Sequence, residues 1–153
     1  MKVVAIVGKK KSGKTTLIAQ LIPSLKQYGD VGCIKHAHEL DLDLPIARDT
    51  DRFFTAGAEV VIGASPEKTI EIYGGTNLTD LIAKMDKSGV DFVLVEGFKS
   101  SDLPKIALNN FPPDEVSNVL TRVDFREDAT MQEGIVNELV PLILALDDYE
   151  VIL

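Results

Sequence analysis

Residues 8–16 carry the strongest structural signal of the sequence and read Gly8-Lys9-Lys10-Lys11-Ser12-Gly13-Lys14-Thr15-Thr16. A strand-like apolar run precedes it at residues 3–7, and a helix-like apolar run follows it at residues 17–22. A strand, the pattern G-x-x-x-x-G-K-[ST] and a helix together form the P-loop, a phosphate-binding motif. Its glycines let the backbone turn tightly and direct N–H groups at phosphate oxygens, while the helix N-terminus adds a positive field. The stretch therefore predicts a nucleotide site made of all these residues, the alternative being a lysine-rich turn before an amphipathic helix.

Two side chains of the motif predict specific chemistry. Lys14 can reach the β- and γ-phosphates of a nucleotide, and the Thr15 hydroxyl can ligate Mg²⁺. We therefore assign Lys14 as a candidate catalytic residue, Thr15 as a candidate metal ligand and Mg²⁺ as the expected cofactor. Lys9 occupies a position at which one class of dimeric P-loop ATPases carries a lysine that reaches the partner's phosphate. The alternative is that the run of three lysines supplies only local charge.

The composition is that of a single globular domain, expected over residues 1–153. The net charge of −8 argues against a general nucleic-acid surface, and a triphosphate explains the local lysine cluster better than DNA does. Cys33 is the only cysteine, which leaves no disulfide framework and favours a cytoplasmic location. No apolar run approaches the length of a membrane span, and the run before the P-loop is too short for a signal peptide.

The remaining pattern alternates strand-like and helix-like segments. Further strands are expected at residues 31–36, 91–95, 105–108 and 116–120, and helices at residues 49–56, 77–87 and 130–146. Residues 59–64 and 68–73 are joined by so short a link that they are expected to pair antiparallel. The sequence therefore predicts an α/β protein with a three-layer P-loop NTPase-type fold: a mainly parallel sheet with the P-loop after its first strand, plus an antiparallel strand pair.

An acidic residue follows the most apolar of these strands. Residues 91–97 read D-F-V-L-V-E-G, a buried strand that ends in an acid and a glycine. In P-loop proteins such a strand delivers an acid towards Mg²⁺ or its water, so Glu96 is a candidate catalytic and metal-binding residue. The alternative is a solvated strand end. Asp49, at the start of a predicted helix, is a second candidate Mg²⁺ contact; equally, it fits a first-turn acid favoured by the helix dipole.

Other polar side chains lie where parallel strands end, which is where ligands bind in open α/β sheets. Lys35 is a candidate nucleotide contact and His36 a candidate substrate or partner contact, unless both are ordinary strand-end residues. Cys33, His36 and His38 do not have the spacing of a standard zinc site. Lys99 and Lys105 are further candidate contacts for a substrate or partner.

A possible base-reading motif follows the last predicted strand. Thr121-Arg122-Val123-Asp124 is similar to the [NT]-K-x-D guanine motif of P-loop GTPases, with arginine in place of lysine. A carboxylate can accept two N–H bonds from the N1 and N2 edge of guanine, a donor pair that adenine lacks. Asp124 is therefore a candidate guanine contact, and the alternative is an acid in the turn after a strand.

Six ordered pieces of the chain, which together span most of residues 3 to 108, resemble one known family. They are Gly8 to Leu17; Ile34-Lys35-His36; the run D-L-P-I-A-R-D-T-D-R at 43–52; Ala56-Gly57-Ala58; the run D-F-V-L-V-E-G-F-K at 91–99; and Pro104-Lys105-Ile106. The P-loop is shared by a great many proteins, whereas the ordered set with K-H and V-E-G-F-K is much more specific. The set resembles the MobB family of molybdopterin-guanine dinucleotide biosynthesis.

The resemblance implies a GTP-binding homodimer with weak GTPase activity. Such a protein assists a MobA nucleotidyltransferase, which joins GMP to molybdopterin. Two other readings stay open. One is a small ATP-dependent ligase or kinase resembling dethiobiotin synthetase, which also has a P-loop, a lysine after its second strand and a V-E-G turn. The other is an adaptor that binds a nucleotide without hydrolysing it.

Overall fold

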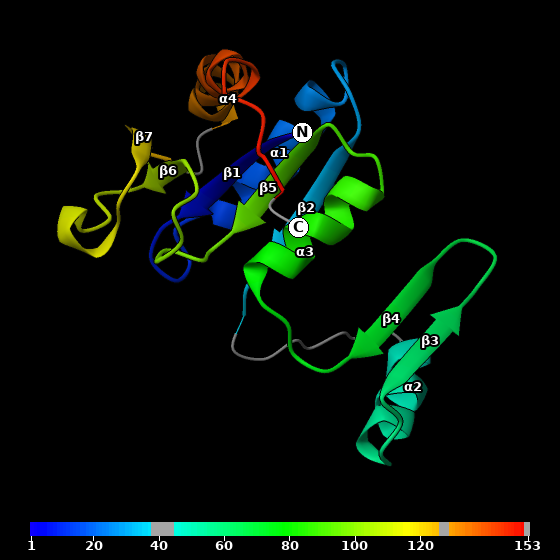
Figure 1. Cartoon of the computed structure of the whole chain (residues 1–153). Helices are drawn as coiled ribbons and strands as arrows, with labels where there is room; N and C mark the ends of the chain where they lie inside the picture. The colour runs from blue at the N-terminus through cyan, green and yellow to red at the C-terminus, as the bar shows by residue number, and fades with distance from the viewer. Residues whose placement is uncertain (38–44, 126–128, 152–153) are drawn as a thin grey trace. The chain divides into compact units, whose positions relative to one another are not determined.

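The structure is a computed structural model that describes residues 1–37, 45–125 and 129–151, apart from the side chains of residues 45–48 and 129–131. The chain divides into two compact units. The first consists of Met1–His36 and Leu78–Leu153, and the second of Ala37–Asn77 (Figure 1).

The first unit is built on a five-stranded parallel sheet. Its strand order is β2-β5-β1-β6-β7, and every neighbouring pair is parallel. The strands are β1 (Lys2–Val7), β2 (Val31–Lys35), β5 (Phe92–Glu96), β6 (Lys105–Leu108) and β7 (Val119–Val123). Because the strands are parallel, their carboxyl ends meet at one edge of the sheet, and the loops that follow β1, β2, β5 and β6 gather there.

Helices cover both faces of this sheet. They are α1 (Lys14–Leu25), α3 (Leu78–Lys87) and α4 (Ala129–Leu144). Val4 and Ile6 of β1 pack with the apolar side chains of α1 and α4, whereas Val3 and Ala5 pack with Ile82 of α3. Successive strand residues face opposite sides, so this division puts α1 and α4 on one face and α3 on the other. The predicted three-layer α/β fold is confirmed.

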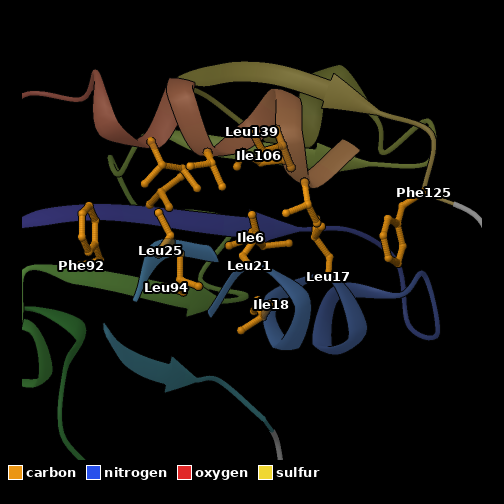
Figure 2. Packing of buried hydrophobic residues seen from close by; sticks show 14 of the residues in the cluster. Ile6, Leu17, Ile18, Leu21, Leu25, Phe92, Leu94, Ile106, Phe125 and Leu139 are labelled. Atoms are coloured by element: carbon orange, nitrogen blue, oxygen red, sulfur yellow. The ribbon is translucent and has the colours of Figure 1, made fainter. Parts of the chain in front are cut away.

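The larger apolar cluster, which lies between the sheet and the α1–α4 pair, runs towards the P-loop. In Figure 2, Phe92 lies at one end of this cluster and Phe125 at the other, beyond Leu17. Leu17 is completely buried, and Phe125 is only 5% exposed. The hydrophobic core therefore extends to the start of α1, immediately below the phosphate-binding motif.

The second unit consists of a helix and a two-stranded sheet. Helix α2 (Pro45–Thr55) packs against β3 (Val60–Ala64) and β4 (Thr69–Tyr73), which pair antiparallel as predicted. Val61 is buried, but its neighbours Val60 and Ile62 are 60% and 63% exposed. Alternate residues of a strand face opposite sides, so one face of this sheet carries exposed apolar side chains.

Two predicted boundaries are wrong. The last strand begins at Val119 instead of residue 116, because a 3-10 turn at Pro113–Glu115 and the left-handed Asn118 (φ 54°) precede it. The first three residues of the predicted guanine motif therefore lie inside β7. Helix α2 begins at Pro45 instead of Asp49, since the fixed φ of proline suits the first helical position. Asp49 is thus not a first-turn acid. Among the described residues, no helix is both long and apolar enough to cross a membrane.

Candidate functional site

The P-loop joins β1 to α1 at the carboxyl edge of the parallel sheet (Figure 1). The loop reverses sharply, because the Ser12 N–H donates to the Lys9 carbonyl at 3.2 Å and Lys11 has a left-handed backbone (φ 63°). Gly13 is also left-handed (φ 91°) and is the N-cap of α1, whose first ladder bond runs from the Leu17 N–H to the Gly13 carbonyl. A left-handed residue is accommodated most easily by glycine, which explains the second glycine of the motif.

Lys14 lies across the loop. Its ammonium group donates to the carbonyls of Gly8 at 3.1 Å and Lys9 at 2.8 Å. Partial burial lowers the pKa of Lys14; the negative charge of Glu96 opposes this shift and the positive charge of Lys35 adds to it. The positive charge of Lys14 is therefore hydrogen-bonded to neutral carbonyl groups, and an anion could replace these carbonyls as partners of the ammonium group.

Three functional candidates lie together: Thr15 in the first turn of α1, Lys35 at the end of β2 and Glu96 at the end of β5. The Thr15 hydroxyl donates to Glu96 Oε2 at 2.9 Å, and Lys35 Nζ lies 3.7 Å from the same oxygen. The Glu96 side chain is 13% exposed. This contact brings together two predicted metal-binding residues that are separated by 81 positions in the sequence. It leaves the two lone pairs of the Thr15 hydroxyl available, because that group uses its single proton on Glu96.

A cavity of about 470 Å³ opens over the start of α1. The P-loop and first helical turn supply residues 11–16, and Glu96 also lines the cavity. Three further lining residues were not predicted: Asn109, Phe125 and Gln132. They follow β6, follow β7 and lie in α4, respectively. The position of Asn109 at a strand's carboxyl end was the one available signal, since Phe125 and Gln132 read as ordinary apolar and helical residues.

Asn109 connects the P-loop to the segment after β7. Its Nδ2 donates to the Ser12 carbonyl at 3.1 Å, and its Oδ1 accepts from the Phe125 N–H at 2.6 Å. Its own N–H donates to the Val123 carbonyl at 2.9 Å, and its backbone is left-handed (φ 52°). In the same loop, Ser12 Oγ is buried and has no hydrogen-bond partner among the described residues. The P-loop is thus fixed from outside, while one of its hydroxyl groups remains unused.

The predicted substrate or partner contacts lie in different environments. His36 is exposed, and its ring stacks on Phe98 with centroids 4.4 Å apart. Lys99 forms an ion pair with Glu115 at 2.7 Å. Lys105 is completely buried, and its ammonium group donates to the carbonyls of Leu103, at 2.8 Å, and Ser101. A substrate could reach Lys105 only if the connection between β5 and β6 opened.

The remaining candidates are not brought into the cavity of the first unit. Asp124 directly follows β7, is exposed and does not line the cavity. Lys9 and Lys10 are exposed on the P-loop. Asp49 belongs to the second unit, and His38 lies outside the described residues. Within the described part of the chain, no three His, Cys, Asp or Glu side chains form a group that could hold a metal by themselves.

Known proteins resemble most of this chain. Residues 3–122 match the family model for "Molybdopterin guanine dinucleotide synthesis protein B". A molybdopterin-guanine dinucleotide biosynthesis adapter protein of Haemophilus influenzae is 36% identical over 124 residues, which cover 78% of this chain and 67% of that protein. A Methanocaldococcus jannaschii protein described as an adapter of the same biosynthesis is 32% identical over 113 residues, which cover 71% of this chain and 47% of the relative. The chain thus matches less than half the length of the M. jannaschii protein.

The fold has solved counterparts. The crystal structure of Bacillus subtilis MobB superposes with a TM-score of 0.72, covering 95% of this chain and 100% of that one, at 23% identity. At that identity the likeness establishes the fold alone. The family match extends from β1 into β7 and includes the P-loop, Glu96 and Asn109. The chain therefore belongs to the molybdopterin guanine dinucleotide synthesis protein B family, known as MobB.

Proposed function

We propose that this chain is a GTP-binding adapter protein of molybdopterin guanine dinucleotide biosynthesis that hydrolyses GTP slowly. The observation that carries the proposal is the cavity over the start of α1, in which Lys14 and the Thr15–Glu96 pair lie together. The role in the pathway rests on the family and on the names of the relatives. The nucleotide chemistry rests on the side chains of the cavity.

A triphosphate is the anion that suits this cavity best. The Lys14 ammonium group would exchange its two neutral carbonyl partners for charged phosphate oxygens, which accept stronger hydrogen bonds. The unused Ser12 hydroxyl supplies a further donor, and the N-terminus of α1 adds its dipole. In hydrolysis, Lys14 would stabilise the negative charge that develops on the phosphate oxygens.

Magnesium fits the oxygen groups beside Lys14. Thr15 and Glu96 would hold the ion or its water, because Mg²⁺ prefers oxygen ligands and usually retains several waters next to one or two protein groups. When bound, Mg²⁺ neutralises phosphate charge. The Thr15 hydroxyl can continue to donate its hydrogen bond to Glu96 while one of its lone pairs faces the metal. Asp49 remains a second candidate ligand.

Guanine selectivity is the part of the proposal that comes from Asp124. Its carboxylate would accept from guanine N1 and N2, whereas adenine would leave it without these donors. A group left unpaired in this way costs about 1–3 kcal/mol, so GTP should bind about ten-fold or more tightly than ATP. Asp124 directly follows β7, and the next residue, Phe125, lines the cavity. Asp124 is therefore close to the site in the sequence.

The proposed partners are a MobA-like nucleotidyltransferase and a second copy of this chain. The adapter role, as named for the relatives, requires a protein that uses or delivers the nucleotide, and the transferase joins GMP to molybdopterin. The homodimer would cover the exposed apolar face of the second unit, where Val60 and Ile62 lie. Apolar side chains in adjacent positions of one sheet face are typical of a protein interface.

The test is calorimetric titration of the full chain with GTP and with ATP, each with Mg²⁺. Wild type should bind GTP more tightly, and Lys14→Ala should reduce the affinity by tens-fold or more, since charge-assisted contacts of this kind contribute about 2–5 kcal/mol. Lys10→Ala is the matched control, because Lys10 is exposed on the same loop and does not line the cavity. Tighter ATP binding would favour the ligase or kinase reading, and unchanged binding by Lys14→Ala would refute the phosphate site.

A further inference from the structure

We infer that Asn109 is a positioning residue that sets the shape of the phosphate loop from the segment after β7. The inference rests on the proposed nucleotide site and adds to it a residue that contacts neither a phosphate nor a base. Its basis is the pair of hydrogen bonds by which one amide group spans the two segments, from the Ser12 carbonyl to the Phe125 N–H.

The bond to Ser12 acts on the loop through the peptide plane. The Ser12 carbonyl and the Gly13 N–H belong to one trans peptide group, so they point in opposite directions. Holding the carbonyl at 3.1 Å from Asn109 Nδ2 therefore fixes the Gly13 N–H, which lies in the same plane and points the opposite way. Consecutive backbone N–H groups with left-handed residues form the concave nests that bind anions. The amide thus orients a phosphate donor without touching the phosphate.

The hydrogen bond to the Phe125 N–H anchors the Asn109 side chain to a segment that is itself held by the core. The Phe125 ring is buried in the core and lies against Gly13, where an added Cβ would be 2.6 Å from its Cδ1 atom. The Phe125 N–H is held by Asn109 Oδ1 at 2.6 Å. The loop is therefore held between a buried ring on one side and an amide on the other, and both belong to the strand ends on the β6–β7 side of the sheet.

The chain offers a matched control for this residue. Asn110 has the same side chain and the same left-handed backbone, with φ 53° against 52° for Asn109, but it is exposed and does not line the cavity. Replacement by glycine suits a left-handed backbone at both positions. Comparing Asn109→Gly with Asn110→Gly thus isolates the amide bridge from the conformation of the turn.

The experiment measures the binding of Mg²⁺-tripolyphosphate, GTP and ATP to wild type and to both glycine variants. Tripolyphosphate has no base, so it reports the phosphate loop alone. Asn109→Gly should bind tripolyphosphate and GTP about five- to ten-fold more weakly, by the same factor, with the GTP-to-ATP ratio unchanged. Asn110→Gly should bind like wild type. A merely structural role would lower the unfolding temperature and leave the affinity of the folded protein as it is.

A second variant keeps the inference testable if Asn109→Gly folds poorly. Asn109→Asp retains an acceptor for the Phe125 N–H but replaces the donor to Ser12 with a carboxylate oxygen, so it should also weaken tripolyphosphate binding. Wild-type affinity for tripolyphosphate in both variants would overturn this inference but leave the proposed function standing. So would a changed GTP-to-ATP ratio, which would make Asn109 a base contact. A wild-type protein that binds neither GTP nor tripolyphosphate would overturn the proposed function and this inference together.

Discussion

The polar and charged side chains of the site contact groups of the chain itself. The Lys14 ammonium group is shared by two loop carbonyls, and Glu96 accepts from Thr15 and lies close to Lys35. In the proposed nucleotide complex, Lys14 would exchange its carbonyl partners for phosphate oxygens, and Glu96 would face the cation. Binding is therefore expected to change the partners of both side chains.

Lys14 should take up protons when it binds a phosphate at alkaline pH. Burial lowers the pKa of Lys14 in the free protein, and the negative charge of a phosphate would raise it again. At a pH between that lowered pKa and the ordinary lysine pKa, Lys14 is more fully protonated in the phosphate-bound protein than in the free protein. Binding therefore takes up protons, and the affinity for phosphate falls as the pH rises. Titration with Mg²⁺-tripolyphosphate at about pH 9, in two buffers of different ionisation enthalpy, should show uptake in wild type and Lys10→Ala. Equal uptake in Lys14→Ala would contradict this assignment.

Glu96→Gln should weaken the dependence of GTP binding on Mg²⁺. The amide retains the size of the side chain but removes the charge that would face the ion, so the affinity gained on adding Mg²⁺ should fall about ten-fold, while the unfolding temperature changes little. Glu115→Gln is the control, since Glu115 also pairs with a lysine but lies outside the cavity. A full Mg²⁺ effect in Glu96→Gln, measured by titration with and without the ion, would remove Glu96 from the proposed metal site.

At the scale of the elements, the start of α1 depends on the absence of a side chain at one position. Gly13→Ala should destabilise the protein because a Cβ would overlap the Phe125 ring and because φ is 91°. Gly89→Ala is the matched control: φ is 75° there, and nothing lies within 4 Å of the added atom. The left-handed backbone costs about 1–2 kcal/mol in both variants, and the overlap should add about 1–3 kcal/mol in Gly13→Ala alone. Urea unfolding measures both, and equal losses would show that the ring moves aside freely.

The sequence predicts those elements whose signals are local. The P-loop, the antiparallel pair and the strand that ends at Glu96 are each encoded within about fifteen consecutive residues, so their pattern can be recognised locally. The start of β7 was misplaced because the left-handed turn at Asn118 cannot be read from composition alone. The role of Asn109 depends on a contact with Ser12, 97 positions earlier, and only its place at the end of a strand indicated it, whereas Phe125 and Gln132 carried no local signal.

At the scale of the whole molecule, the two units differ in how completely they bury their sheets. The parallel sheet is covered on both faces, whereas the two-stranded sheet has α2 on one face and exposed apolar side chains on the other. A two-stranded sheet is marginally stable without further packing. The second unit therefore gains most from a partner, and the proposed homodimer would supply one.

Ile62→Glu should weaken the proposed homodimer. In a symmetric interface the change occurs twice, and losing the burial of each isoleucine costs about 1.5–3 kcal/mol, so the dissociation constant should rise at least about 100-fold. Tyr28→Glu is the control, because Tyr28 is similarly exposed, at 59% against 63%, but belongs to the first unit. Light scattering after size-exclusion chromatography measures the mass. A variant that remains dimeric at the wild-type concentration would place the interface elsewhere.

Because Lys105 is buried, the rate at which it is chemically labelled depends on opening of the connection between β5 and β6. An acylating reagent needs an accessible amine, and the amine of Lys105 is enclosed by the carbonyls of its own loop, whereas Lys99 on the same connection is about half exposed. Mass spectrometry should therefore find Lys99 acylated first and Lys105 only as often as the loop opens. Since that connection begins directly after Glu96, the lag between the two labels would report how often the backbone opens beside the proposed metal ligand.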